Sequence, residues 1–274
     1  MDKIDRLGWA AGFSFMSFGV RVGVRTNRPE LISQIKDHLP PQARLIRPRY
    51  VDLLYSLRVA DRPRRRGTRA FHLLYEEFIQ IARTEDLGEL LVSFRNSVEY
   101  FVPQMAPKVI FVHAGVVGWN ERAILLPGRS FSGKSRLVAA MVKAGAAYYS
   151  DEFAVIDQGG LVHPYARPLS IRSGAETVGT RTPVEAFGGR AARKPIPVGA
   201  VLSLTYKEGA RWQPRTLPRG KGILELLSNT VPVRKRPADS MATLKQATAN
   251  ARFLKGTRGE ADEIAGKILK QMGP

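Results

Sequence analysis

The sequence predicts an α/β protein in which a small α+β N-terminal unit, residues 1–104, precedes a domain with a mixed sheet, residues 105–274. Three observations support this prediction. Residues 13–26 alternate apolar with small or polar side chains, which is typical of strands. Residues 87–102 carry an apolar stripe at helical spacing. Residues 123–145 combine an apolar strand, a glycine-containing loop and an apolar helix.

The N-terminal unit is predicted from strand alternation and from the prolines that bound its helices. Its elements are one or two strands in 13–26, a helix over 31–39, a strand over 51–59, an exposed turn over 61–69 and a helix over 87–102. Pro29 opens the first helix and Pro40 closes it. Pro103 is predicted to end the second, because proline has no amide hydrogen to donate.

The second domain begins with a segment rich in β-branched residues. Its predicted elements are strands over 109–117 and 122–127, a helix over 136–145, strands over 146–150, 153–157 and 198–206, and helices over 223–229 and 262–272. Turns are expected at 118–121 and 157–160, and the Gly- and Pro-containing segment 173–197 is expected to be a mobile loop.

The loop between strand 122–127 and the following helix matches the phosphate-binding pattern G-x-x-x-x-G-K-[ST]. Its residues are Gly128, Arg129, Ser130, Phe131, Ser132, Gly133, Lys134 and Ser135, with Arg136 following in the helix. Glycines let the backbone turn its N–H groups toward a phosphate at a helix N-terminus. Lys134 can reach the β- and γ-phosphates, and the Ser135 hydroxyl can ligate Mg²⁺. The motif therefore predicts binding of a nucleoside triphosphate, with ATP and Mg²⁺ as cofactors.

Two carboxylates, Asp151 and Glu152, follow the predicted strand 146–150. One can accept the proton of an attacking hydroxyl while the other holds Mg²⁺. Neighbouring residues of a strand point to opposite faces, so both reach the metal only if the strand ends there. The alternative is a turn pair that only hydrogen-bonds the backbone.

Residues 108–173 resemble the core of HPr kinase/phosphorylase, in which a V-H strand precedes the loop and a D-D pair follows it. The matching segments are Val112-His113-Ala114, Ile124-Leu125-Leu126-Pro127-Gly128, Ser132-Gly133-Lys134-Ser135 and Tyr149-Ser150-Asp151-Glu152-Phe153. Residues 195–201 and 254–260 are more similar to diverged HPr-kinase-related proteins. The N-terminal unit does not resemble that of the true HPr kinases.

The resemblance implies a phosphoenolpyruvate-carboxykinase-like P-loop fold, with Asp151 as the base and His113 near the transferred phosphate. HPr kinases are hexamers, so it also allows a homo-oligomer. The chain departs from the family pattern in three places: Glu152 replaces the second Asp, Ser170 replaces a carboxylate expected near the metal, and Phe131-Ser132 stands where glycine is common. These departures bear on transfer to HPr and not on nucleotide binding.

Two arginines are candidates for a cationic clamp on the transferring phosphoryl group. Arg172 follows the Ser170 position, and Arg258 lies in a Lys-Gly-Thr-Arg-Gly-Glu segment. The alternative for each is an arginine that only forms a surface contact or a salt bridge. His113 likewise has the alternative of a satisfied histidine within an apolar strand.

Composition limits the partners and the compartment. The chain has no cysteine, which excludes disulfides and thiolate metal sites. No stretch approaches the ~18 uninterrupted apolar residues of a membrane span, and the N-terminus lacks an apolar signal region, so a cytoplasmic protein is expected. The net charge of +19 favours anionic partners such as nucleotides or an acidic protein or peptide. The basic runs at 62–69, 190–194 and 234–236 match no nucleic-acid module.

The favoured function is therefore an ATP-dependent kinase in which Asp151 deprotonates a hydroxyl acceptor. The acceptor is a Ser of a protein or peptide, or a small alcohol. A nucleotide-binding regulatory or assembly protein without transfer chemistry is the alternative, and Ser170 favours it. A nucleic-acid-dependent NTPase rests on net charge alone.

Overall fold

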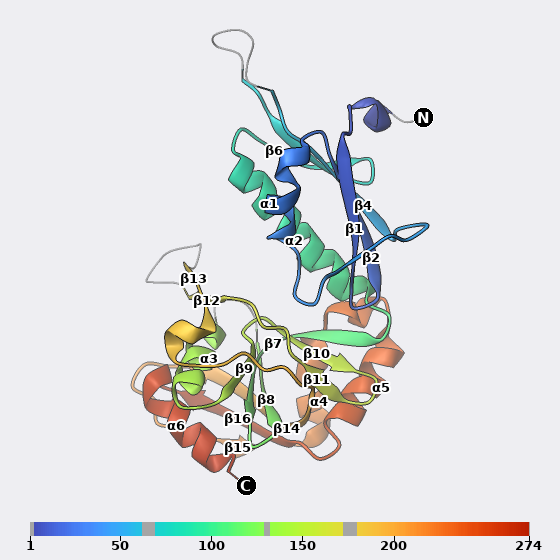
Figure 1. The fold of residues 1–274 in the computed structure, drawn as a ribbon. Coiled ribbons are helices and arrows are strands. Elements are labelled where there is room, and N and C mark those ends of the chain that lie inside the picture. Colours follow the sequence, from blue (N-terminus) through green and yellow to red (C-terminus); the bar gives the residue numbers. More distant parts are fainter. Residues whose placement is uncertain (1–2, 62–68, 129–131, 172–179, 274) are drawn as a thin grey trace. The chain divides into compact units, whose positions relative to one another are not determined.

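The computed structural model describes residues 3–61, 69–128, 132–171 and 180–273. The chain divides into two compact units, residues 1–107 and residues 108–274 (Figure 1). The predicted turn at 61–69 lies largely outside the described residues, as do Arg129, Ser130, Phe131 and Arg172. Within the described part of the chain, no helix is both long and apolar enough to cross a membrane.

The first unit is a six-stranded sheet with the order β3-β1-β2-β4-β5-β6. Its strands are β1 (Ala11–Ser17), β2 (Val20–Thr26), β3 (Arg44–Ile46), β4 (Leu53–Arg58), β5 (His72–Glu76) and β6 (Ile79–Thr84). The alternation in 13–26 thus corresponds to two strands, which pair antiparallel. The hairpin β5–β6 and the short β3 were not predicted, since their apolar residues do not alternate over a long enough run.

Two helices accompany this sheet, α1 (Ile32–Lys36) and α2 (Leu87–Met105). The helix predicted over 31–39 is shorter than expected. It starts from a 3-10 turn at Pro29–Leu31 and ends at Lys36. Beyond it the amides of His38 and Leu39 donate to carbonyls three residues back. The hydrogen bonding has therefore changed to the 3-10 type before Pro40.

The prediction that Pro103 ends the second helix is wrong, because α2 continues to Met105. Asp86 caps its N-terminus by accepting from the Glu89 amide at 2.8 Å. Pro103 lies in the last turn, where its missing N–H removes a single helical bond, and the amide of Ala106 still donates to Val102 at 2.9 Å. Val102 and Pro103 are both buried, and this burial offsets the loss.

The α2 helix is held to its sheet by an aromatic pair and a short polar chain. The rings of Tyr55 and Phe94 meet edge to face with centroids 5.3 Å apart, and both are fully buried. The Tyr55 hydroxyl lies 2.8 Å from the Ser97 hydroxyl, which donates to Glu76 at 2.9 Å. The buried polar groups at this contact are therefore satisfied.

The second unit is a mixed sheet with the order β11-β10-β7-β8-β14-β16-β15, and β9 also pairs with β7. The strands are β7 (Val109–Trp119), β8 (Arg122–Pro127), β9 (Ala147–Ser150), β10 (Phe153–Asp157), β11 (Leu161–His163), β14 (Ile196–Tyr206), β15 (Arg215–Thr216) and β16 (Arg252–Arg258). The helices are α3 (Lys134–Lys143), α4 (Arg219–Ser228), α5 (Pro237–Ala247) and α6 (Ala261–Gln271).

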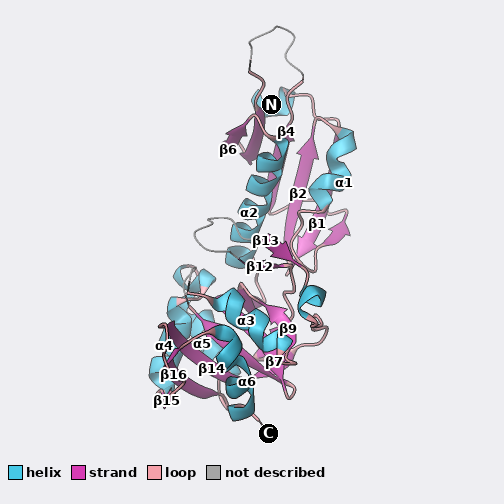
Figure 2. Ribbon diagram, turned by 90° about the vertical axis from the view of Figure 1, so that its left-hand side faces the viewer, coloured by secondary structure: helices cyan, strands magenta, loops and turns pink. Residues whose placement is uncertain are grey.

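Helices cover both faces of this sheet, with α3 and α6 on one face and α4 and α5 on the other (Figure 1, Figure 2). Alternation along the strands separates the two cores. On β8, Ile124 and Leu126 pack toward α3 and α6, whereas Ala123 and Leu125 pack toward α4 and α5. The central strands are therefore buried on both sides, which confirms the prediction of a mixed α/β unit.

Two expectations for this unit need correction. The segment 173–197 is not a loop throughout: it contains strand β13 (Thr180–Thr182), which pairs with β12 (Leu169–Ile171), and a 3-10 turn at Val184–Phe187. Residues 172–179 lie outside the described residues. Helix α5 and strand β16 were not predicted, because neither carries a long apolar pattern.

A pair of glycines in α4 tests this packing. A methyl group on Gly222 would lie 2.1 Å from the Phe253 ring, whereas nothing lies within 4 Å of Gly220. We expect Gly222→Ala to destabilise the protein by about 1–3 kcal/mol through overpacking. Gly220→Ala should instead stabilise it by up to about 1 kcal/mol. Urea unfolding measures both, and equal stability of the two variants would contradict this packing of α4 on β16.

Candidate nucleotide and phosphoryl-transfer site

The site is organised by strand β7, which changes its hydrogen-bonding neighbour along its length. Residues Val109–His113 pair with β10, and from Val116 onward the same edge pairs with β9. Between these two pairings the amide of Ala114 donates to the Glu152 carbonyl at 3.1 Å. On the opposite edge the His113 carbonyl accepts from the Gly128 amide at 3.3 Å. The acid pair and the start of the loop therefore lie on either side of one point on β7.

The end of the phosphate-loop motif has the backbone shape that the motif requires. Gly133 is the N-terminal cap of α3 and has a left-handed φ of 77°, which favours glycine. Lys134 begins α3, and its Nζ donates to the Gly128 carbonyl at 2.7 Å. The lysine side chain thus folds back over the loop to its first residue. Ser135 and Arg136 follow in the first turn of the helix.

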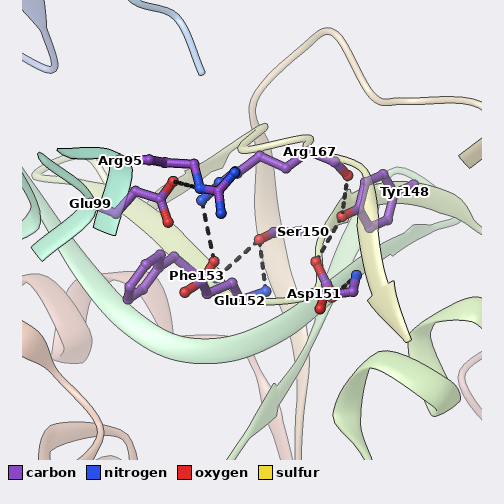
Figure 3. A network of polar contacts seen from close by, with 9 residues as sticks. Arg95, Glu99, Tyr148, Ser150, Asp151, Glu152, Phe153 and Arg167 are labelled. Carbon is purple, nitrogen blue, oxygen red and sulfur yellow. Dashed lines mark hydrogen bonds and ion pairs between the residues drawn. The ribbon is translucent and has the colours of Figure 1, made fainter. Parts of the chain in front are cut away.

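Asp151 is held from two directions (Figure 3). The Tyr148 hydroxyl lies 2.9 Å from Oδ1, and the backbone amide of Ser170 lies 3.3 Å from Oδ2. Burial, and then the negative charge of Asp151, raise the pKa of Tyr148, so its hydroxyl stays protonated and donates. The Arg167 carbonyl, 2.8 Å away, competes for the same proton. The Tyr148 hydroxyl is therefore shared between the Asp151 carboxylate and the Arg167 carbonyl.

Glu152 lies beside Asp151 in the turn between β9 and β10, so neither acid is inside a strand. The Ser150 hydroxyl holds this turn by accepting from the amides of Glu152 and Phe153 at 3.1 and 3.0 Å. The Glu152 side chain is exposed and lies 3.4 Å from Arg167 (Figure 3). The condition under which both acids can serve one site, a strand that ends at this point, is met.

Lys134 is the electrostatic centre of the group. Burial lowers the pKa of Lys134, and the charges of Asp151 and Glu152 act in the opposite direction. Burial also lowers the pKa of His113, and the positive charge of Lys134 lowers it further. The His113 side chain is exposed, and its ring packs on Phe153 with ring centroids 4.6 Å apart. The charge of Lys134 therefore acts on His113, and the charges of the two carboxylates act on Lys134.

The donor set suits a cation that is bound together with a phosphate. Among the described residues, no cluster of three or more His, Asp or Glu side chains could hold a metal by itself. Two carboxylates and the Ser135 hydroxyl match the few protein ligands that Mg²⁺ takes when phosphate oxygens complete its shell. These residues could hold a metal ion together with a nucleotide.

Sequence reasoning missed Tyr148 and Arg167, which support the two acids. An aromatic residue before an acidic turn has many structural uses, so nothing in the pattern singled out Tyr148. Arg258 was considered as a clamp on the phosphoryl group, but its guanidinium donates to backbone carbonyls, including those of Ser132 and Gly133. The proposed clamp Arg172 lies outside the described residues.

Comparison with solved structures yields a distant likeness. No family model matches the chain, and no curated protein matches it. The solved structure of the Hpr(Ser) kinase/phosphatase from Coxiella burnetii is similar over 59% of this chain and 94% of its own, with 15% sequence identity and a TM-score of 0.34. This is a remote likeness of fold, and it assigns no role to any residue here.

The lowered pKa of His113 has a consequence for stability. A histidine whose folded pKa lies below its unfolded value of about 6.5 takes up a proton more readily when unfolded. Stability should therefore fall as the pH drops through about 6.5 toward the folded pKa. His113→Gln should remove this part of the decline, as measured by urea unfolding between pH 5 and 8. An identical pH slope in both proteins would contradict the shift.

Proposed function

We propose that this protein is an ATP-dependent phosphotransferase that moves the γ-phosphoryl group to a hydroxyl acceptor. The observation that carries the proposal is the grouping of Lys134, at the end of a G-x-x-x-x-G-K-S loop, with the carboxylates of Asp151 and Glu152. A cation for the phosphates and a base for the acceptor are the two groups that such a transfer needs most.

The loop and α3 supply the donor half of the site. The amides at the N-terminus of α3 have no helical partners and can donate to phosphate oxygens. Lys134 would exchange its bond to the Gly128 carbonyl for one to the β- or γ-phosphate. Mg²⁺ would be held by Ser135 and by Asp151 or Glu152, and when bound it neutralises charge on the phosphate oxygens.

The acid turn supplies the acceptor half. As the acceptor oxygen bonds to the γ-phosphorus and ADP leaves, the hydroxyl proton passes to Asp151. Tyr148 and the Ser170 amide keep that carboxylate in place. His113 is held neutral near the site by its lowered pKa and can donate to or accept from a phosphate oxygen. The net charge of +19 favours a Ser within an acidic protein or peptide, and a small alcohol is the other acceptor class.

A nucleotide-binding regulatory protein is the second candidate, and one observation favours it. Position 170 is a serine whose contribution to the site is its backbone amide, donated to Asp151. The site therefore has two carboxylates where the resemblance implies three. Two are enough to hold a metal–nucleotide complex, so binding would persist even if transfer chemistry were lost.

Nucleotide binding is tested by Lys134→Ala. At 100 times its dissociation constant, a ligand stabilises the folded state by about 2.7 kcal/mol. We expect ATP·Mg²⁺ to raise the melting temperature of the wild type and not that of Lys134→Ala. Lys143→Ala is the control, because Lys143 lies at the exposed far end of the same helix. If the wild type gives no shift at millimolar ATP·Mg²⁺, the proposal fails.

Transfer is tested by Asp151→Asn, which keeps the size of the side chain and removes the proton acceptor. With labelled ATP and candidate acceptors, we expect this variant to lose ~10²–10⁴-fold in transfer rate while its ATP affinity changes only several-fold. Asp157→Asn is the control, since Asp157 pairs with His163 at the far end of β10. Transfer by Asp151→Asn at the wild-type rate would exclude Asp151 as the base. If the wild type and both variants bind nucleotide but none of them transfers phosphate, the result would favour the regulatory protein.

A further inference from the structure

Arg258 occupies an unusual position for a charged residue. It is the last residue of β16, and only 4% of its surface is exposed. Strands β8, β14 and β16 run parallel, so their carboxyl ends share one edge of the sheet. The phosphate loop leaves β8 at that same edge. Arg258 is therefore brought to the loop by the topology of the sheet, although it is far from the loop in the sequence.

The guanidinium of Arg258 binds the backbone of the loop. Its Nη2 donates to the carbonyls of Ser132 and Gly133 at 3.3 and 3.1 Å, and its Nη1 donates to the Gly259 carbonyl at 3.1 Å. Among the residues that the structure describes, no carboxylate lies within ion-pair distance of it. Burial lowers the pKa of Arg258, as expected for a desolvated cation, and Tyr206 lies under it with the ring centroid 5.2 Å away.

These two carbonyl bonds constrain where the neighbouring amides point, together with the helical bond from the Leu137 amide to the Gly133 carbonyl at 3.2 Å. In a planar trans peptide the C=O and N–H groups point in opposite directions. The Ser132 carbonyl shares its peptide with the Gly133 amide, and the Gly133 carbonyl shares its peptide with the Lys134 amide. A guanidinium that holds both carbonyls on one side therefore turns both amides to the other side. These amides belong to the N-terminus of α3, where an anion would be bound.

Gly133 is matched to this arrangement. A Cβ atom at position 133 would lie 2.3 Å from Nη2 of Arg258, so any side chain there would displace the guanidinium. Glycine at this position is thus required twice, by its left-handed φ of 77° and by the approach of Arg258. The second requirement comes from this arginine and not from the motif.

We propose that Arg258 is a positioning residue that orients the amides of Gly133 and Lys134 toward the phosphates of the bound nucleotide. It acts from behind the loop, through backbone carbonyls, and the charge of Glu260 already acts on its guanidinium. The inference rests on the proposed function, because it takes the anion to be the polyphosphate of the nucleotide. It differs from a phosphoryl clamp, which would contact the transferred group directly.

The test compares Arg258→Lys with Arg252→Lys. Lysine keeps the positive charge but lacks the planar fork that holds two carbonyls together. Arg252 lies at the exposed start of the same strand and donates to the Gln271 carbonyl, so its variant controls for the loss of an arginine from β16. The measurements are the ¹⁵N order parameters of the Gly133 and Lys134 amides in the free protein, and the dissociation constants for Mg²⁺–tripolyphosphate and for ATP·Mg²⁺.

We expect Arg258→Lys to lower both order parameters from about 0.85, a rigid backbone, to below about 0.6. We expect it to weaken tripolyphosphate and ATP by a similar factor, ~10–100-fold, the usual range for hydrogen bonds to a charged group. Arg252→Lys should change neither quantity. A lower melting temperature in Arg258→Lys with unchanged order parameters would overturn the inference, because it would leave Arg258 a purely structural residue.

The two proposals fail in different ways. If the wild type binds neither ATP nor tripolyphosphate, the proposed function is wrong, and the order parameters alone decide whether Arg258 orients the loop. If the wild type binds both ligands and Arg258→Lys binds them equally well, the inference is wrong while the proposed function stands.

Discussion

The change of partner along strand β7 is the constraint on which the rest of the site depends. At His113 and Ala114 the strand bonds the start of the phosphate loop on one edge and the acid turn on the other. Because both contacts are backbone hydrogen bonds, the spacing between the loop and the carboxylates is set by the sheet and not by flexible side chains. A continuous pairing of β7 with one neighbour would have placed Asp151 inside a strand.

The placement of the loop and the acid turn on either side of β7 brings their charged side chains together. Lys134 and Asp151 are half-buried, Glu152 is exposed, and the charges of both acids act on Lys134. Each acid is also restrained, Asp151 by Tyr148 and Glu152 by Arg167. Nζ of Lys134 donates to the Gly128 carbonyl, next to the carboxylates that Tyr148 and Arg167 contact, and under the proposed function it would exchange this bond for one to a phosphate.

Local patterns in the sequence predicted the parts of this structure that local chemistry determines. The loop motif around Lys134 and the acid pair at Asp151 were found because their residue types and spacing are rare together. The prediction at Pro103 was wrong because the number of helical hydrogen bonds that a proline removes depends on how close it lies to the end of the helix. Tyr148 could not be predicted, because an aromatic residue before an acidic turn has many structural uses. The contact of Arg258 with the loop could not be predicted, because it comes from strand pairing that joins distant parts of the chain.

A crystal structure of the protein with Mg²⁺ and a non-hydrolysable ATP analogue tests the central claim most directly. The account predicts the β-phosphate at the amides of Gly133 and Lys134, with Nζ of Lys134 moved from the Gly128 carbonyl to a phosphate oxygen. It also predicts that the γ-phosphate faces the carboxylate of Asp151. A nucleotide bound elsewhere on the chain, or a γ-phosphate turned away from Asp151, would contradict it.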